Sequence, residues 1–449
     1  MGKRVALHNL GCKVNAYELD RIAGTLVAQG YEIVPFSEPA DIYIVNTCTV
    51  TNIADRKSRQ MLHRAKKNNP KAVVVALGCY VDTDGDQVKK DPCIDIALGN
   101  RDKAGLVSVL EAHAERNAQH APSGDAWQEA GAEHVYRSRT RAYLKIQDGC
   151  NLFCSYCIIP YARGRSISRP VQDVLREAQA LAAEGVKEVV LTGIHLTSYE
   201  PHPAGEHNGN AAGIAAAGIH PLAGLVQRIN DIEGIERIRL GSLEPRMMTA
   251  ETVDALQRAD KLCPHFHLSL QSGSDTVLQR MRRHYTTAEF AKSVALLREA
   301  FDNPAITTDL IAGFPGETEA EFEEGRRFVE QIAFYETHVF PFSARKGTPA
   351  AGMEGQLTQK EKAARADVLI RMSRENARLY RAAFLGRPLS VLWEEKEEIG
   401  GKTFLTGHSD RYVKVALAAE SGMVHAGDTG IVTPASFLTD EVLFAEGSV

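Results

Sequence analysis

The sequence has few aromatic residues, no long apolar run and no marked excess of charge of either sign. Aromatic residues make up 7% of its 449 residues, charged residues make up 24%, and the formal net charge is −5. No stretch approaches the roughly 18 consecutive apolar residues that a membrane-spanning helix needs. Such a composition excludes wholesale disorder and a fibrous repeat. At roughly 100 to 200 residues per domain, we expect a folded, soluble protein of two to four domains.

The chain also lacks a recognisable secretory signal. It starts MGKRVALHNLGCKVN, where His8 and Asn9 interrupt the apolar part and no small-residue cleavage site follows. We therefore expect a cytoplasmic location, in which thiols stay reduced. The cysteines are accordingly interpreted first as metal ligands or catalytic groups and only second as disulfides. The eight are Cys12, Cys48, Cys79, Cys93, Cys150, Cys154, Cys157 and Cys263.

Three apolar runs in the first hundred residues each end in a cysteine. RVALHNLGC, DIYIVNTC and AVVVALGC are predicted strands, and helical patterns at 17–29 and 53–68 lie between them. This alternation predicts an α/β domain with a parallel, doubly wound sheet. Because parallel strands bring their carboxyl ends to one edge, we expect Cys12, Cys48 and Cys79 to converge there.

Six further strand-like runs alternate with helical patterns between residues 141 and 343. They are RAYLKIQ (141–147), EVVLTGI (188–194), RIRLGSL (237–243), HFHLSLQ (265–271), ITTDLIAG (306–313) and THVFPFS (337–343). Six βα units predict a partial (βα)6 TIM barrel whose chemistry lies at the carboxyl ends of the strands. The aperiodic stretch 201–221 is predicted to be a surface insertion, and no function is assigned to it.

Beyond the barrel, an Arg-rich helical pattern runs from about 354 to 383 and ends before Gly386 and Pro388. Five short alternating runs follow and predict a small antiparallel β-barrel. The predicted domains are residues 1–115, a linker of small and polar residues at 116–136, the core at 137–380 and the small β-barrel at 381–449.

The sharpest chemical signal is GCNLFCSYC, in which Cys150, Cys154 and Cys157 follow the first barrel strand. Three thiolates at this spacing can hold a 4Fe-4S cluster and leave one iron open to another ligand. A zinc site would want a fourth cysteine or histidine nearby, and the following IIPYARGR offers none. The spacing favours an iron–sulfur cluster over zinc.

The CxxxCxxC motif in this context resembles the radical S-adenosylmethionine (SAM) superfamily. The segments GCKVNAYE, VNTCTVTNIADRKSR and ALGCY resemble the cluster-binding domain of its methylthiotransferase branch, and the C-terminal strands resemble its TRAM domain. GCKVN and NTCTVTNIADRKSRQ look most like the MtaB type, the tRNA N6-threonylcarbamoyladenosine methylthiotransferases. The resemblance covers nearly the whole chain apart from the linker and the 201–221 insertion.

The resemblance implies an enzyme with two 4Fe-4S clusters and S-adenosyl-L-methionine as cofactors. The CxxxCxxC cluster would bind SAM, whose reductive cleavage gives a 5′-deoxyadenosyl radical. The second cluster, on Cys12, Cys48 and Cys79, would carry the sulfur that is transferred. The implied substrate is the anticodon stem-loop of tRNA, with a methylthio group inserted at C2 of threonylcarbamoyladenosine. An electron donor such as flavodoxin or ferredoxin is implied too, and the oligomeric state stays open.

Two alternative functions stay open at this point. The same chemistry could act on isopentenyladenosine in tRNA or on a ribosomal protein side chain. An iron–sulfur RNA-binding or electron-transfer protein would carry out no group transfer at all, and it would not produce 5′-deoxyadenosine from SAM.

Polar residues and glycines at the cluster motif and the strand ends are the candidates for binding SAM. The candidate cofactor-binding residues are Tyr156, Thr192, Gly193, Ser242, Glu244, Gln271 and Gly313. AGFPGET, which contains Gly313, has two glycines that let the backbone approach a flat adenine closely. Helix caps and βα turns use the same residue types, so that alternative stays open.

Two basic segments indicate contact with RNA phosphates. Residues 56–71 carry seven Lys or Arg and no acid, and the seven Lys or Arg between 137 and 169 face only Asp148. Solvated faces are the alternative. Residues 381–449 hold 6 Lys or Arg against 10 Asp or Glu. This domain would therefore dock RNA by shape or through Trp393, Phe404 and Tyr412, or RNA binding would rest mainly on the other domains.

The remaining expectations concern three arginines and two cysteines. Arg163, Arg165 and Arg169 follow the cluster motif and are candidates for binding the carboxylate of a threonylcarbamoyl group. Salt bridges to the barrel rim are the alternative. Cys93 and Cys263 lack a strand-end position and are predicted to be packing residues.

Overall fold

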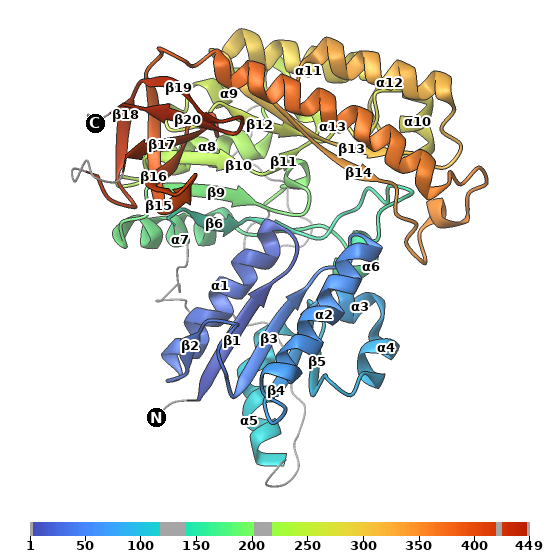
Figure 1. Ribbon diagram of the computed structural model, residues 1–449, viewed down its shortest axis with the longest axis vertical. Coiled ribbons are helices and arrows are strands. Elements are labelled where there is room, and N and C mark those ends of the chain that lie inside the picture. The colour runs from blue at the N-terminus through green and yellow to red at the C-terminus, as the bar shows by residue number, and fades with distance from the viewer. Residues whose placement is uncertain (1–2, 117–139, 202–217, 419–423, 447–449) are drawn as a thin grey trace. The chain divides into compact units, whose positions relative to one another are not determined.

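The computed structural model describes residues 3–116, 140–201, 218–418 and 424–446 (Figure 1). The chain divides into two compact units. The N-terminal unit comprises Met1–Ser138, Asp148–Ser166 and Ser343–Ala351, and the barrel unit comprises Arg139–Gln147, Ile167–Phe342 and Gly352–Val449. Residues 117–136 of the predicted linker at 116–136 and most of the predicted insertion at 201–221 lie outside the described residues, whereas Arg116 ends a helix. In the part of the chain that is described, no helix has the length and apolar character needed to cross a membrane.

The N-terminal unit contains a five-stranded, wholly parallel sheet in the order β2-β1-β3-β4-β5. Its strands are β1 (Arg4–Asn9), β2 (Glu32–Val34), β3 (Ile42–Thr47), β4 (Val73–Gly78) and β5 (Ile96–Leu98). The three predicted strands are confirmed as β1, β3 and β4. The two edge strands were not predicted, because three residues are too few to show a periodic pattern.

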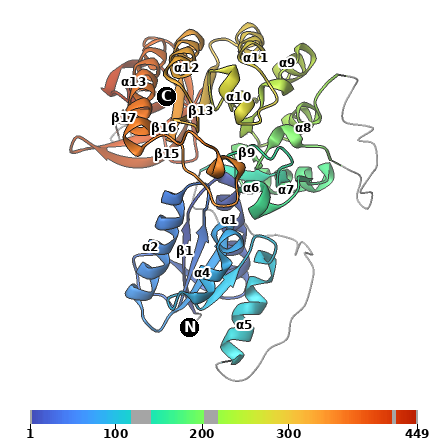
Figure 2. The same cartoon turned by 90° about the vertical axis from the view of Figure 1, so that its right-hand side faces the viewer.

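Helices cover both faces of this sheet (Figures 1 and 2). On one face α1 (Lys13–Ala28) and α5 (Leu106–Arg116) pack against the sheet through Leu19, Leu26 and Leu110. On the other face α2 (Asn52–Asn68) packs through Leu62 and Ala65. Successive strand residues enter the two cores alternately, as a sheet buried on both sides requires. The shorter helices of this unit are α3 (Cys79–Thr83), α4 (Gly85–Lys90), η1 (Lys103–Gly105), α6 (Ile159–Arg163) and η4 (Pro349–Gly352).

All six predicted strands of the barrel unit are present and pair in parallel. They are β6 (Ala142–Lys145), β9 (Glu188–Thr192), β10 (Arg237–Leu240) with β11 (Ser242–Leu243), β12 (His265–Leu268), β13 (Ala305–Ala312) and β14 (Glu336–Pro341). Gly241 separates β10 from β11, so β10 pairs with β9 while β11 pairs with β12. The first part of the third predicted strand is therefore hydrogen-bonded to the second predicted strand, and its last part is hydrogen-bonded to the fourth. Two further strands, β7 (Gln147–Asp148) and β8 (Ile167–Ser168), have two residues each.

Helices follow the barrel strands, as βα units require. They are α7 (Val171–Ala183), η2 (Leu196–Ser198), α8 (Pro221–Asn230), η3 (Pro245–Met247), α9 (Ala250–Gln257), α10 (Asp275–Arg280), α11 (Thr287–Ala300), α12 (Glu319–Ile332) and α13 (Gln359–Ala382). The last helix was predicted from about 354 but begins at Gln359. Thr358 and Glu361 form a capping box there, which satisfies the first free N–H groups of the helix.

The C-terminal strands form a curled sheet in the order β18-β15-β16-β17-β20-β19, consistent with the expected TRAM-like domain. The strands are β15 (Leu389–Ile399), β16 (Lys402–Ser409), β17 (Lys414–Ala418), β18 (Thr429–Val432), β19 (Pro434–Thr439) and β20 (Val442–Ala445). One of the five predicted runs, TGIVTPA (429–435), divides into β18 and the start of β19. All pairs are antiparallel except β17 with β20.

The predicted RNA-stacking role of the aromatic residues in this domain is wrong for two of the three. Trp393 is 0% exposed and Phe404 is 7% exposed, because alternation along β15 and β16 turns both into hydrophobic cores. Tyr412 is stacked between His265 and His408, with ring centroids 5.1 and 4.5 Å away. Trp393 and Phe404 therefore stabilise hydrophobic cores and cannot stack on bases.

A buried ion pair joins the barrel strands to the C-terminal domain. The Arg239 guanidinium lies 2.9 Å from the Glu188 carboxylate on the neighbouring strand, and it also donates to the Ser409 and Asp410 carbonyl oxygens. Burial opposes the charged form of Glu188, but Arg239 and Arg141 outweigh it and lower the pKa of this carboxyl to about 2. The turn after β16 is therefore fixed to the barrel by a fully hydrogen-bonded charge.

Replacing Glu188 should test this anchor. Glu188→Gln leaves Arg239 buried without its counter-charge, so unfolding in urea should become easier by about 3 to 5 kcal/mol at pH 7. Because the folded pKa lies below the ordinary 4.5, the ionic contribution is complete at neutral pH and is lost as the pH falls from about 4.5 toward 2. The difference between wild type and variant should shrink over that range.

Glu236→Gln provides the matched control. Glu236 pairs with Lys187 at 2.6 Å, but both side chains are more than a third exposed, so the loss should be below about 1 kcal/mol. Equal losses for the two variants, measured by circular dichroism, would contradict the anchoring role of Glu188.

Candidate functional site

Three cysteines lie at the carboxyl edge of the N-terminal sheet. Cys12 follows β1 and caps α1, Cys48 follows β3, and Cys79 follows β4 as the first residue of α3. Gly11 has φ +110°, and a Cβ atom there would lie 3.2 Å from the Cys48 sulfur. The loops after β1 and β3 therefore approach each other closely, and the structure brings the three cysteines together.

The electrostatics of these thiols suit a metal cluster. Burial raises the pKa of Cys48, and repulsion from the neighbouring Cys79 and Cys12 thiolates adds to the rise, which brings the pKa to about 11. Iron binds the thiolate form, and its positive charge offsets both penalties. These residues fit a cationic cluster better than they fit a set of isolated thiols.

Buried amides hold the cysteine loops in place. Asn15 donates to the Leu10 carbonyl at 2.8 Å and to the Thr47 carbonyl at 2.9 Å, which ties the loop after β1 to the loop after β3. Asn46 donates to the Asn15 carbonyl at 2.8 Å. The sequence analysis did not single out these residues, although Asn15 belongs to GCKVN and Asn46 to VNTC.

The CxxxCxxC segment folds into a tight loop in the same unit. Gly149 has φ +67°, and a side chain there would collide with the Arg165 carbonyl oxygen. The loop is closed by bonds from the Cys150 amide to the Gly164 carbonyl and from the Cys157 amide to the Cys154 carbonyl. The Leu152 amide donates to the Cys150 sulfur at 3.5 Å. Cys150 and Cys154 are buried and Cys157 is half-buried, so one loop presents three thiols.

A third segment completes the N-terminal unit. The Ala350 amide donates to the Ser155 carbonyl at 2.8 Å, which fixes the middle of the CxxxCxxC loop. Arg345 pairs with Asp55 at 2.6 Å and donates to Thr49 at 2.6 Å, just after Cys48. Both cysteine triads are thus parts of one compact unit built from three stretches of the chain.

The candidate SAM-binding residues lie where the strands end. Tyr156 is half-buried between the last two cysteines of its motif, Thr192 is buried at the end of β9, and Gly193 follows it. Ser242 is exposed at the start of β11. Glu244 is buried and forms ion pairs with Arg283 at 2.5 Å and His195 at 3.4 Å, so its carboxylate is already fixed in position.

Gln271 and Gly313 both have a left-handed backbone. Gln271 has φ +71° and bonds through its backbone to the Asp309 carbonyl and the Ile311 amide, which extends the pairing beyond β12. Gly313 has φ +73°, and a Cβ atom there would lie 2.6 Å from the Lys362 side chain. Glycine is therefore required in the AGFPGET turn by both conformation and space.

The barrel strands also bring together a polar group that was not predicted. His267, Asp309 and His338 lie close together on the neighbouring strands β12, β13 and β14, and Asp309 pairs with His338 in the parallel register. His267 lies 3.3 Å from the Asp309 carboxylate, and its ring stacks on His338 with centroids 5.9 Å apart. Only pairing registers reveal this group, because the three residues are far apart in the sequence.

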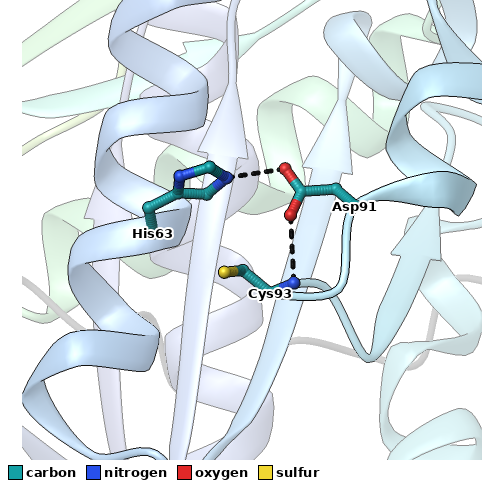
Figure 3. Close-up of side chains that lie close together, drawn as sticks. All are labelled: His63, Asp91 and Cys93. Atoms are coloured by element: carbon teal, nitrogen blue, oxygen red, sulfur yellow. Dashed lines mark hydrogen bonds and ion pairs between the residues drawn. The ribbon is translucent and has the colours of Figure 1, made fainter.

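The two remaining cysteines differ in their surroundings. Cys263 is buried in the core, as predicted. Cys93 is half-buried beside His63 and Asp91 (Figure 3). Asp91 accepts hydrogen bonds from His63 at 2.7 Å and from the Cys93 amide at 3.0 Å, so Cys93 belongs to a polar surface group and not to a core.

Most of the predicted basic residues near the CxxxCxxC motif have acidic partners. Arg163 pairs with Glu18 and Asp148, and Arg169 pairs with Glu177. Salt bridges therefore engage both arginines, although the partners of Arg163 lie in the N-terminal unit and only the partner of Arg169 lies in the barrel unit. Arg165 is exposed, and its guanidinium lies 4.8 Å from the centre of the Phe153 ring.

The basic helix α2 keeps several exposed cations. Lys66 pairs with Asp95 at 2.6 Å, and Arg59 donates to the Tyr80 hydroxyl. The other side chains of the helix that carry positive charge are exposed: they are Arg56, Lys57, Arg64 and Lys67. Asp95, which is distant in the sequence, thus neutralises Lys66. We call the four exposed cations the α2 basic face.

Comparisons with known proteins agree with this architecture. Residues 144–329 match the radical SAM superfamily, and residues 4–99 match the uncharacterized protein family UPF0004. The threonylcarbamoyladenosine tRNA methylthiotransferase MtaB of Bacillus subtilis is 39% identical over 94% of this chain and 91% of its own length. The corresponding protein of Aquifex aeolicus is 35% identical over 92% and 98%. A tRNA-2-methylthio-N(6)-dimethylallyladenosine synthase of Thermodesulfovibrio yellowstonii is 33% identical over 94% and 95%.

A solved structure shares the fold. The radical SAM methyltransferase TsrM of Kitasatospora setae, determined with cobalamin and a [4Fe-4S] cluster, superposes with a TM-score of 0.55 over 78% of this chain and 77% of its own. At 18% identity this similarity concerns the fold alone.

The chain belongs to the radical SAM methylthiotransferase family. Within that family it is of the MtaB type, and the resemblance read from the cysteine motifs is confirmed. Membership makes the chain an enzyme whose cofactors are S-adenosyl-L-methionine and [4Fe-4S] clusters, as predicted.

Proposed function

We propose that this chain inserts a methylthio group at C2 of N6-threonylcarbamoyladenosine, next to the anticodon of tRNA, by radical SAM chemistry. The observation that carries the proposal is the pairing of two three-cysteine sites in one compact unit. Relatives at 34 to 39% identity are named for this reaction.

The reaction explains why the chain needs two such sites. C2 of adenine carries no acidic proton, so side-chain acid–base chemistry cannot activate it. When bound, the two clusters supply the electron that cleaves SAM and the sulfur that becomes the methylthio group. The protein holds these groups, orients the adenosine and keeps water away from the reacting carbon.

Specific roles follow for the candidate residues. Cys150, Cys154 and Cys157 hold the SAM-binding cluster, which we call the radical cluster. The other cluster, which we call the N-terminal cluster, is held by Cys12, Cys48 and Cys79. SAM is bound by the residues at the motif and strand ends, namely Tyr156, Thr192, Gly193, Ser242, Glu244, Gln271 and Gly313.

The anticodon stem-loop is the part of tRNA that we propose is bound, and the α2 basic face supports its phosphates. Four exposed cations on one helix give a local positive surface in a protein of net charge −5. A cytoplasmic location accords with a tRNA substrate. A flavodoxin or ferredoxin is the proposed electron donor.

Polar groups in the barrel support a polar acceptor. A threonylcarbamoyl group carries a carboxylate and an amide-like linker, whereas an isopentenyl group is apolar. Arg163 and Arg169 are already paired, but His267, Asp309 and His338 bring hydrogen-bonding groups together on neighbouring barrel strands. A polar acceptor can hydrogen-bond to such groups, whereas an apolar one cannot.

Iron content and product analysis should separate the two cysteine sites. Anaerobically reconstituted wild-type protein should hold about eight irons, and replacing Cys150, Cys154 and Cys157 by Ala should leave about four. Cys12→Ala should abolish methylthio transfer but keep SAM cleavage to 5′-deoxyadenosine. Cys263→Ser, a buried cysteine outside both sites, is the control. Wild-type transfer by Cys12→Ala would contradict the assignment.

Charge reversal on α2 should weaken tRNA binding. Arg64→Glu with Lys67→Glu should lower the affinity and reduce the slope of log affinity against log salt by roughly one per lost phosphate contact. The matched control is Lys89→Glu with Lys90→Glu, two exposed lysines on α4 that give the same change in net charge. If both pairs weaken binding equally, the α2 basic face has no specific role.

The acceptor can be tested with two tRNA pools in vitro. One pool carries threonylcarbamoyladenosine and the other carries isopentenyladenosine, and mass spectrometry detects the gain of a methylthio group. We expect the gain only in the first pool. Gain only in the second would refute the acceptor, and gain in neither, with SAM cleaved, would favour a protein substrate. Absence of 5′-deoxyadenosine would favour an electron-transfer protein.

A further inference from the structure

A buried arginine contacts the surroundings of both cysteine triads. Arg163 lies on α6, six residues after Cys157, and its side chain is 0% exposed. Its guanidinium donates to Glu18 at 2.9 Å, to Asp148 at 3.0 Å and to the Asn15 side-chain oxygen at 2.5 Å. Asp148 precedes Cys150 by two residues.

The partners of Arg163 on the other side belong to the loop of Cys12. Asn15 and Glu18 follow Cys12 on the first two turns of α1, and their spacing of three places them on one helix face. The Asn15 side-chain oxygen, which accepts from Arg163, also lies 3.8 Å from the Cys12 sulfur. The Arg163 guanidinium therefore joins Asp148, just before the radical-cluster cysteines, to Asn15, which lies next to the N-terminal cluster ligand Cys12.

Asn100 makes a second connection of the same kind. It follows β5, and its side-chain amide lies 3.4 Å from the Cys79 sulfur, 2.6 Å from the Asp82 carboxylate and 3.3 Å from the carbonyl of Ala162. Ala162 directly precedes Arg163. The Asn100 amide thus donates toward Cys79 of the N-terminal cluster site, and it also contacts α6, the helix that follows the radical-cluster cysteines.

Packing alone does not account for this network. A buried ion pair is often no more stabilising than apolar residues of the same volume, so apolar side chains could join α1 to α6 equally well. In this network, by contrast, buried charges of opposite sign are paired. Glu18 accepts hydrogen bonds from Arg163 at 2.9 Å and from Lys103 at 2.5 Å. Arg163 and Asn100 lie beside three cysteine-bearing segments, those of Cys12, Cys79 and the CxxxCxxC motif, which points to a role toward the clusters.

We propose that Arg163 and Asn100 are positioning residues that hold the two cluster sites in a fixed relation and tune the reduction potential of the N-terminal cluster. An N–H donor to a ligand sulfur and a nearby buried cation both stabilise the reduced cluster, which raises its potential. This inference rests on the proposed function, because it assigns the two triads to two clusters that work on one substrate.

Two variants separate the two parts of the inference. Asn100→Ala removes the donor to Cys79 and should shift the potential of the N-terminal cluster to a more negative value. Arg163→Gln removes the charge and the rigid fork, so it should also lower the methylthio product formed per 5′-deoxyadenosine, by about 10-fold to 100-fold. Arg163→Lys keeps the charge but not the fork, so it should restore the potential and not the coupling.

The measurements are an anaerobic redox titration followed by EPR, iron analysis, and the ratio of the two products in holoenzyme. Arg381→Gln is the control, because it breaks another buried ion pair, with Glu336, in the barrel unit. It should leave potential and ratio unchanged. If Arg163→Gln loses iron, its product ratio cannot be interpreted, and the inference is then tested by the potential of Asn100→Ala and the product ratio of Arg163→Lys.

A wild-type potential in Asn100→Ala together with a wild-type product ratio in Arg163→Lys would overturn the inference. So would equal changes in Arg381→Gln. Failure of the proposed function would look different: the wild-type protein itself would form no methylthio product on either tRNA pool, whereas the titration would still report whether Asn100 tunes the cluster.

Discussion

The N-terminal unit depends on the neutralisation of one buried charge. The guanidinium of Arg163 is surrounded by Glu18, Asp148 and Asn15, and these residues come from segments that are more than a hundred positions apart in the sequence. An unpaired charge in this position would cost several kcal/mol, so these two segments must come together for the unit to fold. The unit that results contains both cysteine triads.

The parallel sheet supplies the other requirement of the site. Strands that run in one direction end at one edge, which is how β1, β3 and β4 bring three cysteines together without any local sequence motif. Burial raises the pKa of Cys48, and the proximity of the other two thiols adds to the rise. A cationic cluster removes that penalty, so the fold and the cofactor support each other.

Sequence patterns predicted the long elements and the chemistry, but not the partners of charged groups. The strands of both sheets and the CxxxCxxC motif followed from periodicity and spacing. The strands β2 and β5 were not predicted, because three residues are too few to show a periodic pattern. Lys66 was counted among free cations because its partner, Asp95, lies on another segment. Trp393 was kept as one candidate for stacking on RNA because composition does not reveal which strand face is buried.

The most direct test of this account is the magnetic interaction between the two clusters. In the fully reduced enzyme, pulsed EPR should detect dipolar coupling between two paramagnetic clusters, since both triads belong to one compact unit that Arg163 and Asn100 hold together. Replacing Cys150, Cys154 and Cys157 by Ala should leave one uncoupled signal. Two clusters without measurable coupling in the wild-type enzyme would contradict the account.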